Sequence, residues 1–401
     1  MAASKTWNSI AKTRQAISTP PIEYPHVKRA VTVVGSGPAG LMAADVLSAA
    51  GHKVTIIDHA KSPARKFLLA GRGGLNLTHS EPLEKFLPRY GEAANFLTPM
   101  IKAFPPDDVV RWAQALGQDT FVGSSGRVFP KAMKASPLLR AWLRRLEAQG
   151  VELKSSQRWQ GFDETPTILA LGGASWPEMG SDGAWVETFR AAGIKVNDLK
   201  ASNGRILIPW TEHFKTRFAG MPIKNLELRY AGATAKGEIA ITAQGLEGGA
   251  IYQLCRAMRE QPGQALVIDL KPDLTVDSVA KRLAMPRGRM SQSNFLRKAL
   301  GLTPPAIALL HETKTGISAE NIKSLTLHPQ GFAGIERAIS SAGGVALNEL
   351  DQNCQLKAHP LTYCVGEMLD FDAPTGGYLL QAAFSTAVAA ARDLVKRLAI
   401  A

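Results

Sequence analysis

The chain has 401 residues, 45% of them hydrophobic and 20% charged, with a formal net charge of +13, which is typical of a basic globular protein with two or three domains. No apolar run approaches the ~18 residues that a membrane-spanning helix needs, so we expect no membrane insertion. The three cysteines, Cys255, Cys354 and Cys364, lack CxxC spacing, so we expect no metal, no disulfide framework and a reducing, cytoplasmic location.

Residues 1–29 lack the apolar centre of a signal peptide. They carry five basic residues against one acid, Glu23, and include the pair Pro20-Pro21. We expect a basic, mostly disordered leader, and an organelle transit peptide is the alternative.

Residues 30–58 contain a strand, a glycine-rich turn, a helix and a second strand. The apolar, β-branched run AVTVV predicts a buried parallel strand over 30–34, and KVTII predicts another that stops at Asp58. Between them, the turn GSGPAG leads into a helix that ends at Gly51. A GxGxxG turn between strand and helix, with an acid about 20 residues later, is the fingerprint of a dinucleotide-binding Rossmann unit.

Each position of this unit has a physical task. The first glycine permits the tight turn, the second the close approach of a pyrophosphate, and the third the packing of helix against strand. The helix N-terminus attracts phosphate, and the acid can accept hydrogen bonds from the ribose diol of NAD or FAD. The residues expected to contact the cofactor here are Gly35, Gly37, Pro38, Ala39, Gly40 and Asp58.

Two later segments repeat the strand–glycine–helix pattern. In PTILALGGAS, from Pro166, an apolar strand runs into glycines and SWPEMGSDGAWVETFRAAG then predicts a helix. Near the C-terminus a strand over 361–365 meets a glycine and an acid, and a long helix of small residues starts at Tyr378. Three such transitions suggest one extended ligand lying over several strand ends, although each alone is ordinary α/β architecture. The residues concerned are Gly172, Gly173, Gly366, Glu367, Gly376, Gly377 and Tyr378.

The region 205–336 is different. RILIPW, LELRYAG, GEIAITAQG and ALVIDLKP predict short strands, and helices are expected around 251–260, 276–284 and 294–311. We interpret it as an inserted substrate or cap domain. The nucleotide-binding domain is then discontinuous, with one part over 30–204 and a second over 337–401.

Two stretches, 127–145 and 281–298, each hold six basic residues and no acid. Such patches attract phosphate and could bind nucleic acid. No RRM, KH or zinc-finger signature accompanies them, so a solvated basic surface remains the alternative.

Six motifs, in this order, resemble the BaiN/RdsA-like flavoproteins, also called the YhiN family. They are the GxGxxG turn with its acid, GRGGLNLTHS, GRVFPKAMKAS, LALGGASWPEMGSDG, SSAGGVALNELD and VGEMLDFDAPTGGYLLQAAFSTAVAAA, over roughly residues 30–400. The resemblance implies non-covalent FAD in a glutathione-reductase-type Rossmann-like fold with an inserted β-barrel-like and helical domain. It also implies reduction of an activated C=C bond with NAD(P)H. The implied substrates are steroid-like enones in one branch and a ribosomal RNA uridine in another.

The resemblance also assigns tasks within the segment AGRGGLNLTHSE over 70–81. Bare glycine backbone such as Gly73 allows close approach to the cofactor. Arg72 offers charge to phosphate, and Asn76 and Thr78 can bond the cofactor, unless they only stabilise a turn. Glu367 and Asp370 are expected to hold the ribityl chain and the ring edge.

One position departs from the family pattern. Where the family typically has Gly-Arg-Cys-Asn, this chain has Gly-Gly-Leu-Asn, and Leu75 cannot donate the proton that a cysteine could. His79 is the first candidate donor, because imidazole titrates near neutrality, with a structural histidine as the alternative. Tyr378 and Cys364 are weaker candidates.

No second GxGxxG follows a strand, so NAD(P)H is expected to visit the flavin transiently. Three functions remain open: an FAD-dependent reductase of a small unsaturated molecule, an enzyme that converts ribosomal RNA uridine to dihydrouridine, and a flavin-binding ribosome-associated protein with little activity. The basic stretches favour RNA as a partner, and Leu75 weakens the simplest mechanism for it.

Overall fold

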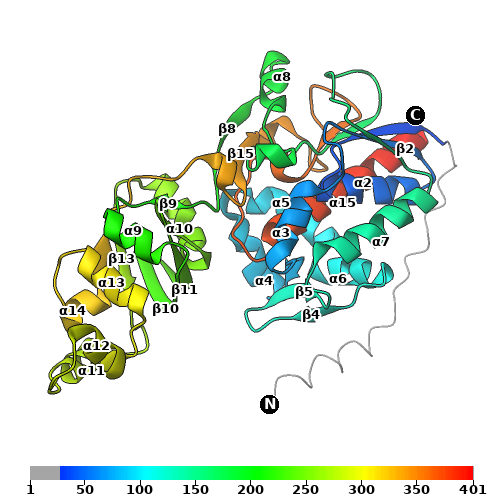
Figure 1. The fold of residues 1–401 in the computed structure, drawn as a ribbon. Helices are drawn as coiled ribbons and strands as arrows, with labels where there is room; N and C mark the ends of the chain where they lie inside the picture. Colours follow the sequence, from blue (N-terminus) through cyan, green and yellow to red (C-terminus); the bar gives the residue numbers. More distant parts are fainter. Residues whose placement is uncertain (1–27, 401) are drawn as a thin grey trace.

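The computed structural model describes residues 28–400, and its larger body is built on a five-stranded parallel sheet (Figure 1). The strand order is β16–β7–β1–β2–β6. Val33, Ile56 and Ile168 are fully buried, as expected where helices cover both faces of a parallel sheet. The predicted α/β fold with a Rossmann-like sheet is confirmed. The strands are β1 (Ala30–Val34), β2 (Lys53–Asp58), β6 (Glu152–Ser155), β7 (Thr167–Leu169) and β16 (Thr362–Cys364).

Two helices from opposite ends of the sequence pack along each other beside this sheet. They are α2 (Pro38–Ala49) and α15 (Tyr378–Ile400), and Figure 1 shows them running side by side. Ala43 on the first and Ala387 on the second are fully buried, and such small side chains let two helices approach closely. This contact joins the C-terminal segment to the first strand–turn–helix unit.

Further helices complete the larger body. Of these, α5 packs on α15, and α7 packs on α2 and α3. They are α3 (Arg65–Ala70), α4 (Leu83–Phe86), α5 (Ala94–Ala103), α6 (Pro106–Ala115), α7 (Ala135–Ala148) and α8 (Trp185–Ala191), with the short 3-10 turns η1 (Gly71–Gly73), η2 (Leu87–Ala93), η3 (Pro177–Met179), η4 (Ile335–Arg337), η5 (Leu347–Glu349) and η6 (Gly366–Met368).

Two small antiparallel sheets border the parallel one. The first has the order β3–β5–β4 and places His79 opposite Arg127. The second pairs β8 with β15, and Figure 1 shows this pair where the chain passes to the smaller body. Their bounds are β3 (Thr78–His79), β4 (Thr120–Val122), β5 (Arg127–Pro130), β8 (Val196–Ala201) and β15 (Ser341–Val345).

The smaller body contains a six-stranded sheet with the order β14–β13–β10–β11–β12–β9. Every pairing in it is antiparallel. Its buried apolar residues, from Ile206 to Leu327, form a cluster separate from that of the larger body. The boundaries at 205 and 336 stay a prediction. The elements are β9 (Ile206–Leu207), α9 (Glu212–Phe218), β10 (Pro222–Tyr230), β11 (Ala233–Thr242), β12 (Gly245–Glu247), α10 (Gly249–Glu260), β13 (Leu266–Asp269), α11 (Val276–Leu283), α12 (Gln292–Leu300), α13 (Pro304–Glu312), α14 (Ala319–Lys323) and β14 (Leu325–Leu327).

Two expected helices differ from the structure. The helix predicted over 294–311 is two helices, α12 and α13, because Gly301 adopts a left-handed φ of 62° and Pro304 starts the next helix. The helix expected after Gly173 begins only at Trp185, since the glycines of MGSDG hold left-handed turns before it. The predicted leader lies outside the described residues, apart from its last two positions.

Candidate functional site

A cavity of about 560 Å³ lies at the carboxyl ends of four adjacent parallel strands. Its wall includes residues at or just after the ends of β1, β2, β7 and β16. Ligands of open α/β sheets bind at this edge, where the loops diverge. The predicted cofactor residues that line the cavity are Gly35, Gly37, Pro38, Ala39, Asp58, Asn76, Gly172, Glu367, Gly376 and Gly377.

The three glycines of the first turn have different surroundings. Gly35 has a φ of 99°, and a side chain on it would overlap the carbonyl oxygen of Ala170. A side chain on Gly40 would overlap the carbonyl oxygen of Gly35. At Gly37, by contrast, a Cβ would meet no atom within 4 Å, and the residue lines the cavity. Two of the glycines thus serve packing, and the middle one leaves open space for a ligand.

Asp58, at the end of β2, is bound to the same turn. Its Oδ2 accepts hydrogen bonds from the amide and the hydroxyl of Ser36, at 2.6 and 2.5 Å. Its Oδ1 accepts one from the amide of Ala60 at 2.7 Å. Asp58 lines the cavity, so its carboxylate both fixes the turn and borders the space beside it.

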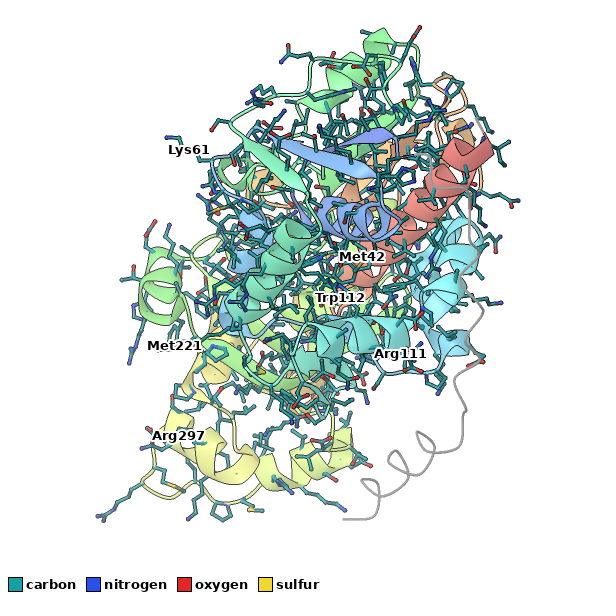
Figure 2. The ribbon with its side chains drawn as sticks, turned by 90° about the vertical axis from the view of Figure 1, so that its right-hand side faces the viewer. Met42, Lys61, Arg111, Trp112, Met221 and Arg297 are labelled. Atoms are coloured by element: carbon teal, nitrogen blue, oxygen red, sulfur yellow. The ribbon has the colours of Figure 1, made fainter. Side chains whose placement is uncertain are left out.

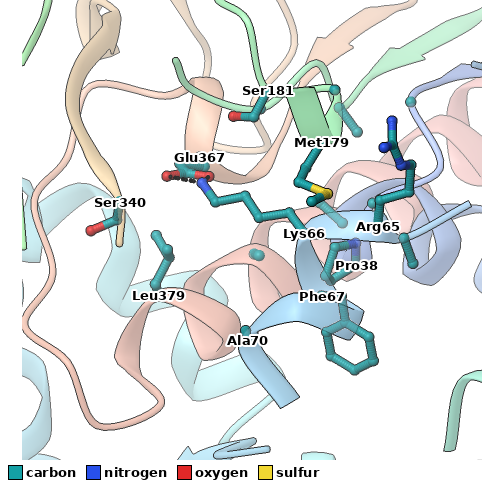
Figure 3. Close-up of a pocket in the computed structure, with 18 of the residues that line it drawn as sticks. Pro38, Arg65, Lys66, Phe67, Ala70, Met179, Ser181, Ser340, Glu367 and Leu379 are labelled. Atoms are coloured by element: carbon teal, nitrogen blue, oxygen red, sulfur yellow. Dashed lines mark hydrogen bonds and ion pairs between the residues drawn. The ribbon is translucent and has the colours of Figure 1, made fainter. Parts of the chain in front are cut away.

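A partly buried ion pair lies at the cavity wall. Lys66, on α3, donates to both carboxylate oxygens of Glu367 at 3.0 and 2.8 Å and to the hydroxyl of Ser175 at 2.5 Å. Glu367 also accepts the amide hydrogen of Ser341 at 3.0 Å. Figure 3 shows the lysine extending to the glutamate, with Ser340 and Leu379 nearby. With its hydrogen-bond partners, the pair joins four segments of the chain and places one positive and one negative side chain at the cavity.

Two buried polar atoms on the cavity wall lack a partner. Asn76 Oδ1 and Ser181 Oγ make no hydrogen bond to any described residue, although both residues line the cavity. Buried polar atoms are nearly always paired in native proteins, so these two point to a ligand with complementary groups. Leu75, beside Asn76, is buried and lines the cavity as an apolar side chain.

Other predicted cofactor residues make contacts within the fold around the cavity. Thr78 donates to Oε1 of Gln381 at 2.6 Å, and a side chain on Gly377 would overlap the backbone of Thr78. Asp370 accepts a hydrogen bond from Asn197 at 2.6 Å. The predicted residues that do not line the cavity are Gly40, Gly73, Thr78, Gly173, Gly366, Asp370 and Tyr378, and the side chain of Arg72 is not among those described.

His79 does not line the cavity, and both of its ring nitrogens have partners. Nδ1 accepts from the amide of Glu81 at 3.1 Å, which leaves Nε2 to donate to the carbonyl oxygen of Ser125 at 2.9 Å. The ring stacks on Tyr378 with centroids 5.4 Å apart. Both ring nitrogens thus have partners within the fold, which is the arrangement of a structural histidine, and a role of His79 as proton donor stays a prediction.

The two weaker candidate donors are Tyr378, whose hydroxyl is hydrogen-bonded within the fold, and Cys364, which is buried away from the cavity. The Tyr378 hydroxyl donates to Glu81 at 2.5 Å, and burial, followed by that carboxylate, raises the pKa of Tyr378 well above its ordinary range. Cys364 is fully buried in β16, and burial raises its pKa well above the ordinary value. Neither lines the cavity.

Sequence reasoning missed several residues that border the cavity. Lys66 could have been predicted as a cavity residue, because it lies on α3, the first helix after Asp58. Arg127 begins the basic stretch 127–145 and Ser181 lies in one of the six motifs, but neither was assigned to the cavity. Tyr252 had no distinguishing pattern and comes from the smaller body.

Within residues 28–400, no helix is long and apolar enough to cross a membrane. In the same range, the structure brings together no group of three or more His, Cys, Asp or Glu side chains that could hold a metal ion.

Known proteins resemble this chain over most of its length. A model of the HI0933-like protein Rossmann domain matches residues 29–393. The chain is 24% identical over 399 residues to the ribosomal RNA dihydrouridine synthase of Escherichia coli (strain K12), covering 90% of this chain and 97% of that protein. It is 23% identical over 410 residues to the 3-dehydro-bile acid delta(4,6)-reductase of Clostridium scindens, covering 92% and 99%.

Among solved structures, the open conformation of a flavocytochrome c3 fumarate reductase is similar, with a TM-score of 0.51 and 16% identity. The likeness covers 93% of this chain and 79% of that one. At this identity it shows the fold alone.

Proposed function

The chain belongs to the HI0933-like family, and on this premise we propose that it is an FAD-dependent oxidoreductase. The observation that carries the proposal is the cavity at the strand ends, lined by the open backbone of Gly37 and the carboxylate of Asp58. That combination suits a dinucleotide with a pyrophosphate and an adenosine ribose.

The residues present fit such a cofactor. Gly37 and the N-terminus of α2 would hold the pyrophosphate, and Asp58 the ribose diol. Asn76 and Ser181 offer buried, unpaired polar atoms to the remaining groups. Bound FAD would supply hydride transfer, while apolar side chains of the chain exclude water from it. These apolar lining residues include Phe67, Leu75, Leu171, Val365, Leu379 and Leu380.

We further propose that the reaction is the reduction of an activated C=C bond with NAD(P)H as transient reductant. Support comes from the names of the two curated relatives, a dihydrouridine synthase and a bile acid delta(4,6)-reductase. A C=C bond conjugated with a carbonyl is the chemical feature common to uridine and to a 3-oxo steroid enone.

The purified protein is expected to be yellow, with non-covalently bound FAD. FMN has neither the adenosine ribose nor the pyrophosphate for which Asp58 and Gly37 are suited. The measurement is chromatography of the cofactor released by heat. A released flavin that migrates as FMN, or protein that stays colourless when FAD is supplied, would refute the proposed function.

Asp58→Ala is expected to weaken FAD binding by about one to two orders of magnitude, because a hydrogen bond to a charged group contributes about 1.5–3 kcal/mol. The domain should still fold. Titration of the apoprotein with FAD measures the effect. Ser36→Ala is the matched control, since it removes the hydroxyl that binds Asp58 but keeps the carboxylate. An equal loss in both variants would mean that Asp58 acts only by fixing the turn.

A second candidate function is the modification of ribosomal RNA, and the surface charge of the smaller body favours it. Arg287, Arg289, Arg297 and Lys298 are exposed, and no described acid pairs with any of them. Figure 2 shows Arg297 extending from the surface of that body. Unpaired exposed cations on one surface suit a phosphate backbone.

The other basic stretch, 127–145, is partly used within the fold. Arg127 lines the cavity, Arg145 pairs with the buried Asp45, and Lys131 pairs with Asp119. Three of the six cations in this stretch thus also contact other parts of the protein, and phosphate binding by the stretch stays a prediction.

A further inference from the structure

The smaller body reaches the cavity through the first turn of α10. Gly249 and Tyr252 of this turn line the cavity wall. Gly248, just before the helix, has a φ of 112°, and a Cβ there would lie 3.1 Å from the carbonyl oxygen of Glu238 on β11. Close packing on the sheet thus fixes the start of the helix, and Tyr252 stands on a rigid element.

The hydroxyl of Tyr252 is available to a ligand. Tyr252 is the one tyrosine among the described lining residues. Its oxygen accepts from the backbone of Gly248, but its hydrogen is donated to no other described side chain or backbone group. Burial, and next the nearby Glu247 carboxylate, raise the pKa of Tyr252 to about 12. Glu247 is itself fixed by Arg205, whose Nε and Nη2 lie 3.1 and 3.0 Å from it. The phenol therefore keeps its proton near neutral pH.

Two other polar residues of the cavity wall are already engaged. The Asn203 amide nitrogen donates to Ser340 Oγ at 2.6 Å and to the carbonyl oxygen of Ala373 at 2.8 Å. Both Asn203 and Ser340 line the cavity. Tyr252 thus offers a neutral donor there that the fold itself does not use.

We propose that Tyr252 binds the substrate by donating a hydrogen bond to a carbonyl oxygen conjugated with the C=C bond that is reduced. The inference rests on the proposed function and names its substrate class, a conjugated carbonyl compound. A donor at the carbonyl oxygen draws electron density from the far alkene carbon, which favours hydride addition there. The resulting enolate, whose oxygen Tyr252 still contacts, then takes a proton from solvent at the near carbon. The bond leaves no charge buried, because donor and acceptor are both neutral.

The test compares wild type and Tyr252→Phe as oxidised holoproteins, in which no hydride is available and the probe is not consumed. The probes are 2-cyclohexenone and a short single-stranded RNA containing uridine. We expect Tyr252→Phe to bind whichever probe the wild type binds about two- to tenfold more weakly, the range for one lost hydrogen bond between neutral groups. Infrared spectra should show the carbonyl stretch of the bound probe at lower frequency in wild type, and this shift should vanish in the variant.

Tyr230→Phe is the matched control, because Tyr230 lies buried in the same body and donates to the Gln261 carbonyl oxygen at 2.8 Å, away from the cavity. It should leave both readouts unchanged. Equal affinity and equal carbonyl frequency in wild type and Tyr252→Phe would overturn the inference, as would a wild type that binds neither probe. The probe that binds identifies a small enone or an RNA uridine as the source of the carbonyl. FAD content is measured first, so a colourless protein refutes the proposed function separately.

Discussion

Gly37→Val is expected to give a folded protein that retains no FAD. A Cβ on Gly37 meets no atom within 4 Å, so the apoprotein has room for a side chain at this position. The same residue lines the cavity at the start of α2, where a pyrophosphate would approach the backbone. The side chain would occupy that space and hold the phosphates away from the helix N-terminus.

Gly40→Val separates loss of the cofactor from loss of the fold. A side chain on Gly40 would overlap the carbonyl oxygen of Gly35, so this variant should lose stability as well as FAD. The measurements are flavin absorbance per protein and the melting temperature of the apoprotein. Gly37→Val with normal flavin content would show that the cofactor does not approach this turn.

Local pattern was sufficient for the first strand–turn–helix unit. The predicted strand over 30–34 and the strand end at Asp58 match β1 and β2. The start of α15 at Tyr378 also matches its prediction. In each case short-range signals coincide: a β-branched run, a glycine with positive φ, and a stretch of helix-forming residues. The resemblance built on six motifs is confirmed by the family match over residues 29–393.

Contacts between distant segments were not predictable in this way. One partner of His79, the carbonyl oxygen of Ser125, comes 46 residues later in the chain. Arg145 pairs with Asp45, 100 residues away, so a cation that seemed part of a surface patch instead helps to hold α7 against α2. Tyr252 reaches the cavity only because the smaller body packs at its edge. The spacing of residues in the sequence does not predict these contacts, because they depend on how whole helices and strands pack in space.

Charge reversal at Arg287, Arg289 and Arg297 is expected to weaken RNA binding and to leave FAD content unchanged. These side chains are exposed in α12 and the segment before it, and none lines the cavity. Each phosphate contact contributes roughly 0.7–0.9 to the slope of log affinity against log salt concentration. Losing three contacts should therefore flatten the slope by about 2 to 3. The measurement is RNA affinity over ~50–200 mM salt, the range in which counterion release dominates.

The matched control reverses Lys134, Arg140 and Arg144, which are exposed on and just before α7 of the larger body. It changes the net charge by the same amount, so a general effect of charge would flatten both slopes alike. A loss confined to the first triple variant would locate the RNA on the smaller body, the one that brings Tyr252 to the cavity. Identical slopes in wild type and both variants would instead make the positive charge a solubility feature. The reduction of a free, small enone would then be the better-supported reaction, because nothing else in the described structure favours a polyanionic substrate.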